Sequence, residues 1–309
     1  MKKKIFIDGR AGTTGLQIEE RLKGRDDVEL IALPDELRKD LSAREKILNE
    51  ADVVFLCLPD AAAVEAVSLI KNDRTVVIDA STAHRTNPDW AYGFAELGDE
   101  FYEKIKCGKR IANPGCHASG FIALVYPLIK SGMLSPSAKL SAHSVTGYSG
   151  GGKSMIADYE SVERSPLLSA PRQYGIAQAH KHLPEMVKIT GLECAPIFSP
   201  IVADFYSGME VTVPLFSDQL NYGGIEDVKA LYKKCYNDEI IYYSDESEGG
   251  FLSAASLSGK DCMQIGVYGN DERMILVARY DNLGKGASGS AVECLNIVLG
   301  CDKTKTLVL

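Results

Sequence analysis

Short apolar runs alternate with amphipathic stretches along the first third of the chain. The apolar runs are rich in β-branched and aromatic residues, as strands are, and they cover residues 3–8, 28–33, 51–58 and 74–81. The stretches between them repeat apolar residues at helical spacing and cover residues 16–24, 42–50 and 61–73. Strands and helices in regular alternation predict an α/β fold with a parallel, Rossmann-like sheet over residues 1–115.

The pattern changes after residue 120, where strand-like runs follow one another with few helices between them. These runs are 139–147, 193–202, 208–216, 262–269 and 273–281, and the first of them leads into a glycine-rich loop. They predict an α+β domain on a mixed or antiparallel sheet. The final stretch, 281–300, is a glycine loop followed by an apolar helix that we expect to pack on the first domain. We therefore predict one domain over 1–115, completed by 285–309, and a second over 116–284.

The composition and net charge of the chain indicate which kinds of binding partner to expect. The chain has 309 residues, of which 45% are hydrophobic and 25% charged, and its formal net charge is −8. Binding to nucleic acid or to an anionic membrane draws on clustered Lys and Arg, so we expect neither partner and favour a small molecule. No apolar run approaches the ~20 residues that span a bilayer, and the first apolar run is too short for a signal peptide. We expect a cytoplasmic protein.

Eight cysteines are scattered along the chain without a C-x-x-C pair or a zinc-ligand spacing, which predicts free thiols and no metal site. Cys116 is set apart by its neighbours. Pro114 disfavours a helix before it, and apolar residues at helical spacing follow Gly120, so we expect a helix to begin close to Cys116. A helix N-terminus stabilises a thiolate, which suits a nucleophile. The other interpretation is a small buried hydrophobic residue.

Glycines fill the turn between the first strand and the first helix. Gly9, Gly12 and Gly15 have the spacing G-x-x-G-x-x-G, which suits a pyrophosphate held close to the backbone at a helix N-terminus. A plain tight turn is the alternative. The strands and helices that follow favour a dinucleotide site.

Charged residues of both signs follow the second strand. Asp35 and Glu36 would suit a ribose 2′-hydroxyl, whereas Arg38, Lys39 and Arg44 would suit a 2′-phosphate. The three basic residues favour NADP as the cofactor. A solvated loop of mixed charge is the other interpretation.

Two of the five histidines, His180 and His182, lie close together just before Pro184. If a helix starts here, Pro184 and Glu185 suit its first turn. A histidine is a natural proton-transfer partner for a cysteine nucleophile at neutral pH. Each could also be an ordinary surface or capping residue.

Several motifs together resemble the N-acetyl-γ-glutamyl-phosphate reductases, and the length is similar to that of their short form. The motifs run from residue 3 to about 300 in family order: IFIDGRAGTTGLQI, LPDAAAVEA, IDASTAHRT, YGFAEL, ANPGCHASG, SVTGYSGGGKSM, HKHLPEM and DNLGKGASGSAV. The resemblance implies an oxidoreductase of arginine biosynthesis with an aspartate-semialdehyde-dehydrogenase-like fold. It would use NADPH to reduce an acyl phosphate to a semialdehyde through a cysteine thioester, releasing phosphate, and would be a homo-oligomer, either a dimer or a tetramer.

The resemblance also assigns roles to residues. The catalytic residues it implies are Cys116, His180 and His182. The residues implied for substrate binding are Arg85, Asn113, Ser149 and Gly150. Those implied for cofactor binding are Gly9, Gly12, Thr13, Thr14, Gly15, Arg38, Ser81, Asn282, Lys285 and Gly286, and no metal is implied.

The chain departs from the family beside the cysteine. His117 stands where the family usually has Tyr, and its closeness to the thiol makes it a second candidate for the catalytic base. Because successive side chains at a helix start diverge, we favour the pair at 180 and 182, and His180 within it. We expect the His180 imidazolium to protonate the oxyanion formed on Cys116, or to assist its stabilisation, and later to remove the proton as the thiolate leaves.

Other functions fit parts of the pattern. An aspartate-semialdehyde dehydrogenase shares the architecture and the cysteine, although the segment HKHLPEM fits the acetylglutamyl enzyme better. Outside the enzymes, an NADP-binding regulator could sense oxidation through Cys116, and a degenerate subunit could act only by assembly. The retained cysteine motif argues against a degenerate subunit.

Overall fold

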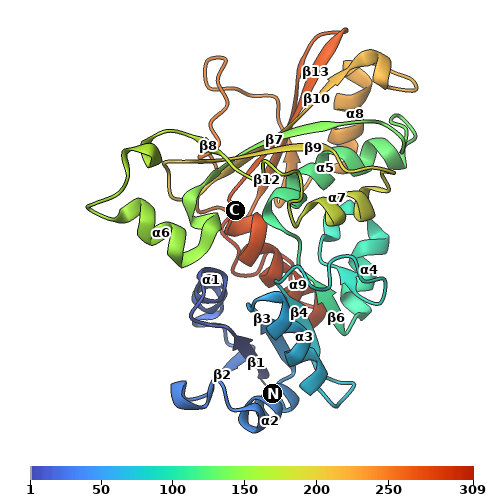
Figure 1. Cartoon of the computed structure of the whole chain (residues 1–309). Helices are drawn as coiled ribbons and strands as arrows, with labels where there is room; N and C mark the ends of the chain where they lie inside the picture. Colours follow the sequence, from blue (N-terminus) through green and yellow to red (C-terminus); the bar gives the residue numbers. More distant parts are fainter. Residues whose placement is uncertain (1) are drawn as a thin grey trace. The chain divides into compact units, whose positions relative to one another are not determined.

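The computed structural model describes residues 2–309, which divide into two compact units (Figure 1). The first unit extends to Pro114 and resumes with Ala287–Leu307; the second comprises Gly115–Gly286 and Val308–Leu309. The last two residues therefore belong to the second unit, whereas the sequence pattern predicts that the whole segment 285–309 completes the first. Their backbone pairs with Asp261, whose N–H donates to the Val308 carbonyl over 2.6 Å.

The first unit is built on a six-stranded sheet in the order β2-β1-β3-β4-β6-β5. Its strands are β1 (Lys3–Asp8), β2 (Val28–Ile31), β3 (Val53–Leu56), β4 (Val76–Asp79), β5 (Ala91–Tyr92) and β6 (Arg110–Ala112). Every neighbouring pair is parallel. All residues of β3 and β4 are buried, as expected for a parallel sheet covered on both faces. The predicted Rossmann-like sheet is confirmed.

Helices cover both faces of this sheet. They are α1 (Thr13–Leu22), α2 (Leu41–Glu50), α3 (Asp60–Leu69), α4 (Asp99–Cys107) and α9 (Gly289–Leu299). On β1, Ile5 joins the core formed with α1, α4 and α9, and Phe6 joins the core formed with α2 and α3. The alternation of side chains along a strand explains this division. Nine residues of α9 are buried, so the apolar C-terminal helix lies within the first unit.

The second unit contains a seven-stranded mixed sheet in the order β11-β12-β13-β10-β7-β9-β8. Its strands are β7 (Ser141–Gly147), β8 (Arg172–Gln173), β9 (Ile197–Ala203), β10 (Met209–Phe216), β11 (Ile241–Tyr243), β12 (Met263–Gly269) and β13 (Arg273–Tyr280). The pairs β7/β9 and β11/β12 are parallel and the others antiparallel. The prediction of a mixed sheet is confirmed.

Four helices accompany this sheet: α5 (Cys116–Lys130), α6 (Gly152–Glu160), α7 (Leu183–Thr190) and α8 (Ile225–Cys235). Short helical turns complete the chain at η1 (Asp35–Leu37), η2 (Ala95–Leu97), η3 (Tyr148–Gly151), η4 (Pro166–Ser169), η5 (Ser217–Gln219) and η6 (Gly284–Ser288). The glycine-rich segment after β7 was expected to be a loop. It forms η3 and the start of α6 instead, because the residues after its glycines, KSMIADYE, readily form a helix.

The two faces of the second sheet differ. Residues Met209, Val211 and Val213 of β10 are buried toward α5, which packs on this strand. The alternate residues point to the other face, where Phe216 is 60% exposed and Ile197 of β9 is 66% exposed. We call this second face the open face.

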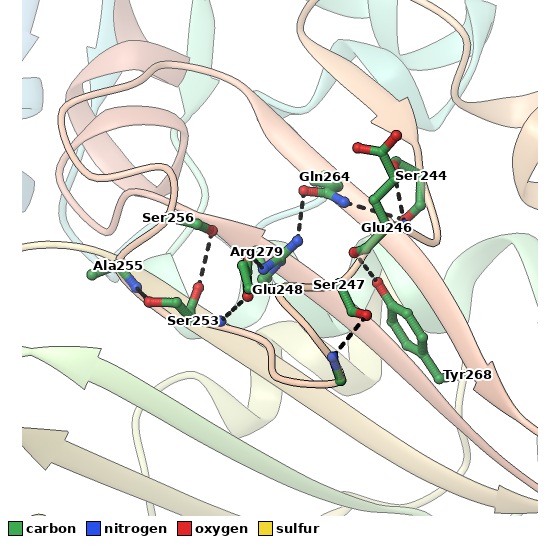
Figure 2. Close-up of polar contacts among 11 residues, drawn as sticks. Ser244, Glu246, Ser247, Glu248, Ser253, Ala255, Ser256, Gln264, Tyr268 and Arg279 are labelled. Carbon is green, nitrogen blue, oxygen red and sulfur yellow. Dashed lines mark hydrogen bonds and ion pairs between the residues drawn. The ribbon is translucent and has the colours of Figure 1, made fainter.

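Polar side chains occupy the end of the open face near the β11–β12 connection. Arg279 pairs in register with Gln264 and with Glu210. Figure 2 shows the Arg279 guanidinium donating to Glu248 over 2.6 Å and to Gln264 over 3.0 Å. The Oε2 atom of Glu210 is buried and has no hydrogen-bond partner among the described residues, and burial raises the pKa of this carboxyl. The open face therefore carries an unsatisfied acceptor.

Over residues 2–309, no helix is both long and apolar enough to cross a membrane. The same residues contain no group of three or more His, Cys, Asp or Glu side chains arranged to hold a metal ion.

Candidate active site

The glycine turn after β1 is shaped partly by the chain itself. Gly9 has φ +85°, and a Cβ there would overlap the carbonyl oxygen of Cys57. The Gly12 N–H donates to the Gly9 carbonyl over 2.9 Å and closes the turn. A Cβ at Gly12, by contrast, would meet no protein atom closer than 3.4 Å. Gly9 is thus required by the fold, while Gly12 leaves the backbone open to a ligand.

The same turn leads into the N-terminus of α1. Gly12 is the N-cap and supplies no side chain, and Thr13, Thr14 and Gly15 form the first turn. Thr13 and Thr14 line a cavity of about 180 Å³, and a second cavity of about 400 Å³ extends from this turn to the end of β2. Uncapped N–H groups at a helix N-terminus attract a phosphate, so these residues fit the pyrophosphate of a dinucleotide.

Only one of the three basic residues expected at a 2′-phosphate is available there. Arg38 lines the larger cavity and lies 3.4 Å from the Asp35 carboxylate. Lys39 is exposed and is not among the lining residues. Arg44 is buried, and its guanidinium pairs with Asp8 over 2.9 Å and with Glu65 over 2.8 Å. The expectation for Arg44 was wrong, since its charge is already neutralised inside the unit.

Sequence reasoning missed Arg10, which lies within the glycine turn and lines the same cavity as Arg38. Its side chain is 54% exposed and lies 3.5 Å from Glu19. Arg10 belongs to the glycine turn and not to the end of the second strand, where a residue that binds the 2′-phosphate is expected from the sequence.

Arg85 and Asn113 are joined at the carboxyl ends of β4 and β6. The Arg85 Nε donates to the Asn113 carbonyl over 2.9 Å, and its Nη2 donates to the Ala80 carbonyl over 3.0 Å. The Asn113 amide donates to the Ala287 carbonyl over 2.9 Å. These contacts fix the guanidinium and the loop that precedes Gly115. Their predicted roles in substrate binding stay predictions.

Ser81 belongs to a neighbouring cluster. Its hydroxyl donates to the buried Asp79 carboxylate over 2.7 Å, and the His84 ring nitrogen Nδ1 lies 2.6 Å from the same carboxylate. The His84 ring stacks on Trp90 with centroids 3.9 Å apart. His84 was not singled out from the sequence, because its partner lies five residues away in a strand.

Cys116 is the first residue of α5, as predicted, and Gly115 is the extended N-cap. Two contacts hold this helix end in place. The Gly115 N–H donates to the Glu185 carboxylate over 2.8 Å, and the Tyr280 hydroxyl donates to the Cys116 carbonyl over 2.6 Å. The Gly120 N–H donates to the same Tyr280 hydroxyl, and a Cβ at Gly120 would lie 2.6 Å from it. Gly120 is therefore needed for the phenol to enter the first turn.

Residues from the Asp-Asn-Leu segment lie close to Cys116. A Cβ at Gly286 would lie 3.1 Å from the Cβ of Cys116. The Asn282 amide donates to the Ser149 hydroxyl over 3.0 Å, and a Cβ at Gly150 would lie 3.4 Å from that amide nitrogen. Cys116 and Gly286 thus lie together, and Asn282 lies with Ser149 and Gly150.

Asp281 fixes the loop that carries Lys285. Its carboxylate accepts N–H groups from Leu283 over 2.7 Å, Gly284 over 2.9 Å and Gly259 over 2.6 Å. Lys285 follows in the turn η6 and is buried, with 1% of its surface exposed.

The histidine pair lies at the start of α7, which begins at Leu183. The His182 backbone N–H donates to the Nδ1 of His180 over 3.2 Å, so the neutral His180 ring carries its proton on Nε2. Burial, and secondarily the charge of Lys181, lowers the pKa of His180. The expected resting imidazolium at position 180 is therefore disfavoured at neutral pH.

His117 points away from solvent and is already engaged. Its Nδ1 lies 2.7 Å from the Ser144 hydroxyl and its Nε2 lies 2.6 Å from the Tyr174 hydroxyl. Burial, followed by the charges of His180 and Lys181, lowers the pKa of His117 to about 3. Such a ring stays neutral with both nitrogens occupied, so His117 is not suited to be the base. Tyr174 and Ser144 were not identified from the sequence.

Comparison with known families defines the class of protein. Residues 7–105 match the semialdehyde dehydrogenase NAD binding domain, and residues 116–282 match the semialdehyde dehydrogenase dimerisation domain. The chain therefore has a nicotinamide-dinucleotide-binding domain and a semialdehyde dehydrogenase second domain.

Full-length relatives narrow the class. The N-acetyl-γ-glutamyl-phosphate reductase of Sinorhizobium medicae is 44% identical over 308 residues, which cover 97% of this chain and 99% of that protein. N-acetyl-γ-glutamyl-phosphate reductase 2 of Nostoc sp. is 45% identical over 313 residues, covering 97% of each chain. This chain belongs to the N-acetyl-γ-glutamyl-phosphate reductase family.

Solved structures agree on the fold. Aspartate semialdehyde dehydrogenase II of Vibrio cholerae, complexed with ASA, has a TM-score of 0.75 at 16% identity, covering 97% of this chain and 99% of that one. Aspartate semialdehyde dehydrogenase of Candida albicans, solved with NADP, has a TM-score of 0.68 at 15% identity and the same coverages. The aspartate-semialdehyde-dehydrogenase-like fold expected from the sequence is confirmed.

Proposed function

We propose that this protein is an oxidoreductase that reduces N-acetyl-γ-glutamyl phosphate to N-acetylglutamate semialdehyde in arginine biosynthesis, with release of phosphate. The observation that carries the proposal is the position of Cys116 at the first residue of α5, beside Gly286, in a chain of this family. The family membership supplies the substrate class, and the helix N-terminus supplies a physical reason for a reactive thiol.

Cys116 is the nucleophile in this proposal. Its thiolate attacks the γ-carbonyl carbon, and the N–H groups at the start of α5 stabilise the negative oxygen that forms. The carbon–oxygen bond to phosphate then breaks, phosphate leaves with the electron pair, and a thioester remains on Cys116. Glu185 and Tyr280 hold the helix end that positions the sulfur.

Reduction of the thioester requires a hydride, which is the chemistry that a bound reduced nicotinamide supplies. The resulting thiohemiacetal oxyanion collapses when the carbon–sulfur bond breaks and its electron pair returns to Cys116. The carbonyl forms directly from the oxyanion, and the one proton that the overall reaction takes up comes from solvent and ends on the released phosphate. A neutral His180 donating a hydrogen bond from Nε2 would stabilise both oxyanions, and its lowered pKa supports that role.

We assign NADPH as the cofactor within the same proposal. The strand β2 ends at Ile31, and the carboxylate that follows it in the cavity lining, Asp35, lies 3.4 Å from Arg38. Two guanidinium groups, those of Arg38 and Arg10, line this cavity and would suit a 2′-phosphate, while the Asp35 carboxylate at the strand end lies beside one of them.

Removing the Arg38 charge is expected to weaken the binding of NADPH more than that of NADH. Arg38→Ser should raise the Michaelis constant for NADPH about tenfold while changing that for NADH little, since a guanidinium–phosphate contact is lost only with NADPH. Steady-state kinetics with both cofactors measures the two constants. The neighbouring Lys39→Ser is the matched control, and equal effects of Arg38→Ser on both cofactors would contradict this assignment.

A side chain in the glycine turn is expected to lower the affinity for both nicotinamide cofactors. Gly12→Val adds a branched side chain where the protein leaves open space, so affinity for NADPH should fall at least about tenfold while the fold survives. Calorimetric titration measures the affinity, and circular dichroism checks the fold. A folded Gly12→Val protein with normal NADPH affinity would remove this loop from the cofactor site.

The reaction itself is tested most directly in reverse. Incubation with N-acetylglutamate semialdehyde and NADP should produce NADPH continuously only when inorganic phosphate is present, because phosphate must release the thioester before the next turnover. Aspartate semialdehyde in place of the acetylated substrate separates the aspartate enzyme from the proposed one. Turnover of neither semialdehyde, with NADPH still bound, would indicate a cofactor-binding regulator.

The open face of the second sheet is our proposed subunit interface of a homodimer. The region matches a dimerisation domain, and the exposed Phe216 and Ile197 with the unsatisfied Glu210 carboxylate oxygen are features that a partner subunit would cover. Light scattering of the purified protein gives the oligomer mass. A monomer at micromolar concentration would reject this interface.

A further inference from the structure

The loop of residues 174–182 joins β8, at the edge of the second sheet, to α7. The strands β8 and β9 pair in antiparallel register, with Gln173 facing Ile201. If β8 continued in this register, Ile176 would lie opposite Phe198. The chain turns away from β9 instead, and Ile176 is 80% exposed. The loop therefore leaves the backbone of Phe198 without a neighbouring strand on this side.

The side chain of Gln178 pairs with Phe198 in place of that strand. The Gln178 amide nitrogen donates to the Phe198 carbonyl over 2.8 Å, and the Phe198 N–H donates to the Gln178 amide oxygen over 2.9 Å. These are the two hydrogen bonds that an opposite strand residue would make with its backbone. Because Phe198 is buried, both of its backbone groups need partners within the protein. The amide thus anchors the loop on β9.

The backbone of Gln178 has a conformation that glutamine seldom adopts. Its φ is +53°, in the left-handed region that favours glycine and asparagine. The Gln178 N–H donates to the Gly175 carbonyl over 3.0 Å and closes a tight turn. Glycine would satisfy this turn with less strain, so the turn alone does not explain a glutamine. A side chain long enough to pair with Phe198 does.

Both residues that are bonded to Gln178 lie beside the His180 ring. The ring centroids of Phe198 and His180 are 5.2 Å apart, and a Cβ at Gly175 would lie 3.7 Å from the Cδ2 of His180. The His180 Nδ1 accepts the His182 N–H over 3.2 Å. The ring therefore lies between two neighbours that Gln178 joins to each other.

We propose that Gln178 is the positioning residue of His180, and that its amide holds the imidazole in one orientation and one tautomer, with Nε2–H available to the oxyanions formed on Cys116. The inference rests on the proposed role of His180 in that reaction. In this role Gln178 acts through the ring that it holds. A misplacement of a catalytic group by about 1 Å can cost as much as about 10²-fold in rate, so a positioning residue has a measurable effect.

The first test observes the His180 ring directly and needs no substrate. In full-length protein with 15N-labelled histidine, the ring nitrogens of His180 are recorded at pH 8 and are assigned by their loss in His180→Ala. The wild-type ring should show one protonated and one unprotonated nitrogen, as in a fixed Nε2–H tautomer. Gln178→Met keeps the length of the side chain but loses both hydrogen bonds. Its two nitrogen signals should move toward each other, because the released ring exchanges tautomers.

The second test measures catalysis. Gln178→Met should lower kcat about tenfold and leave the Michaelis constant for NADPH nearly unchanged, because a misplaced donor weakens only the stabilisation of the oxyanions. In the His180→Ala background the same substitution should cost less than about twofold, since no ring is left to position. Steady-state kinetics with NADPH and acyl phosphate compares the four proteins. Losses that simply multiply in the double variant would overturn the inference.

Gln178→Gly separates the amide from the backbone conformation. Glycine adopts a φ of +53° freely, so the turn should still form, but the pairing with Phe198 is lost. This variant should lower kcat and mix the tautomers as Gln178→Met does, and it is the second variant if Gln178→Met does not fold. A folded Gln178→Gly protein with wild-type kcat and wild-type ring signals would overturn the inference.

Asn49→Leu is the matched control. The Asn49 amide nitrogen donates to the Leu69 carbonyl over 2.8 Å, and its oxygen accepts the Lys71 N–H over 2.7 Å, so this side chain also pairs with backbone groups, within the first unit. Its removal should lower thermal stability without changing the His180 signals or kcat. The same result for Gln178→Met would mean that Gln178 has only a structural role and would overturn the inference.

These outcomes are separate from those of the reverse assay. If neither semialdehyde is turned over, mixed tautomers in Gln178→Met would still support the fixing of His180, while the proposed reaction would be rejected. Normal reverse turnover, with unchanged ring signals and kcat in Gln178→Met, would leave the proposed reaction standing and overturn the inference.

Discussion

Replacing Cys116 by serine is expected to leave NADPH binding intact and to lower turnover by on the order of 10⁴- to 10⁶-fold. Serine is nearly isosteric with cysteine, and the side chain at 116 is partly exposed, so the fold should survive. A hydroxyl has a far higher pKa than a thiol and is a poor nucleophile without a dedicated base. Calorimetry measures the cofactor affinity, and the reverse reaction with phosphate measures turnover.

The other seven cysteines provide the controls for this result. Burial raises the pKa of Cys57 to about 12 and also raises those of Cys235, Cys262 and Cys301, so these thiols should label slowly. Cys194 is exposed and free, and Cys194→Ser should keep full activity. Labelling of Cys116 should inactivate in proportion to modification, and prior loading with acyl phosphate should protect it. Substantial activity in Cys116→Ser would mean that the thiol has only a structural role in packing and is not the nucleophile.

The elements that the sequence predicted well are those set by local physics. The start of α5 at Cys116 follows from Pro114, which excludes a helix before it, and from the apolar spacing after it. The buried strands β3 and β4 read as continuous apolar runs because both faces of their sheet are covered. The glycine turn before α1 was identified by spacing alone.

The expectations that the structure overturned depend on contacts between residues that are far apart in the sequence. Arg44 looked available because its neighbours in sequence are charged, yet its partners Asp8 and Glu65 come from a strand and a helix far along the chain. No pattern of neighbouring residues predicts an ion pair of this kind. Arg44 is buried whereas Arg38 and Lys39 are not. The packing of the helices, and not the local sequence, decides which basic side chains can reach a ligand.

The surroundings of Cys116, the proposed nucleophile, were the hardest part of the site to predict. Cys116 and the histidine pair can be identified by motif, but the Tyr280 hydroxyl that enters the first turn of α5 comes from β13. Gly120 marks that contact in the sequence only in retrospect, as the residue that gives the phenol room. Likewise, the neutral state of His117 depends on burial beneath Tyr174 and beside Ser144, which sequence spacing cannot reveal.

Changes at position 180 should distinguish a hydrogen-bond donor from an acid. Removing the ring with His180→Ala is expected to lower kcat about 10²- to 10³-fold, as for the loss of one oxyanion donor. His180→Gln keeps a neutral N–H donor and should retain at least tenfold more activity than the alanine variant. Single-turnover kinetics with NADPH and acyl phosphate compares the two at pH 7.

The pH dependence of the wild-type enzyme gives an independent check, with a definite sign. The pKa of His180 lies below the ordinary histidine value of 6.5, so an imidazolium is lost as pH rises through that lower value. A reaction that needs the imidazolium would slow about tenfold per pH unit between pH 6.5 and 7.5. A neutral donor predicts no such fall, and the rate should rise or level off as the Cys116 thiolate forms. A steep fall of the reaction rate over this pH range, with His180→Gln as inactive as His180→Ala, would contradict the neutral-donor role and indicate that His180 acts as a proton donor.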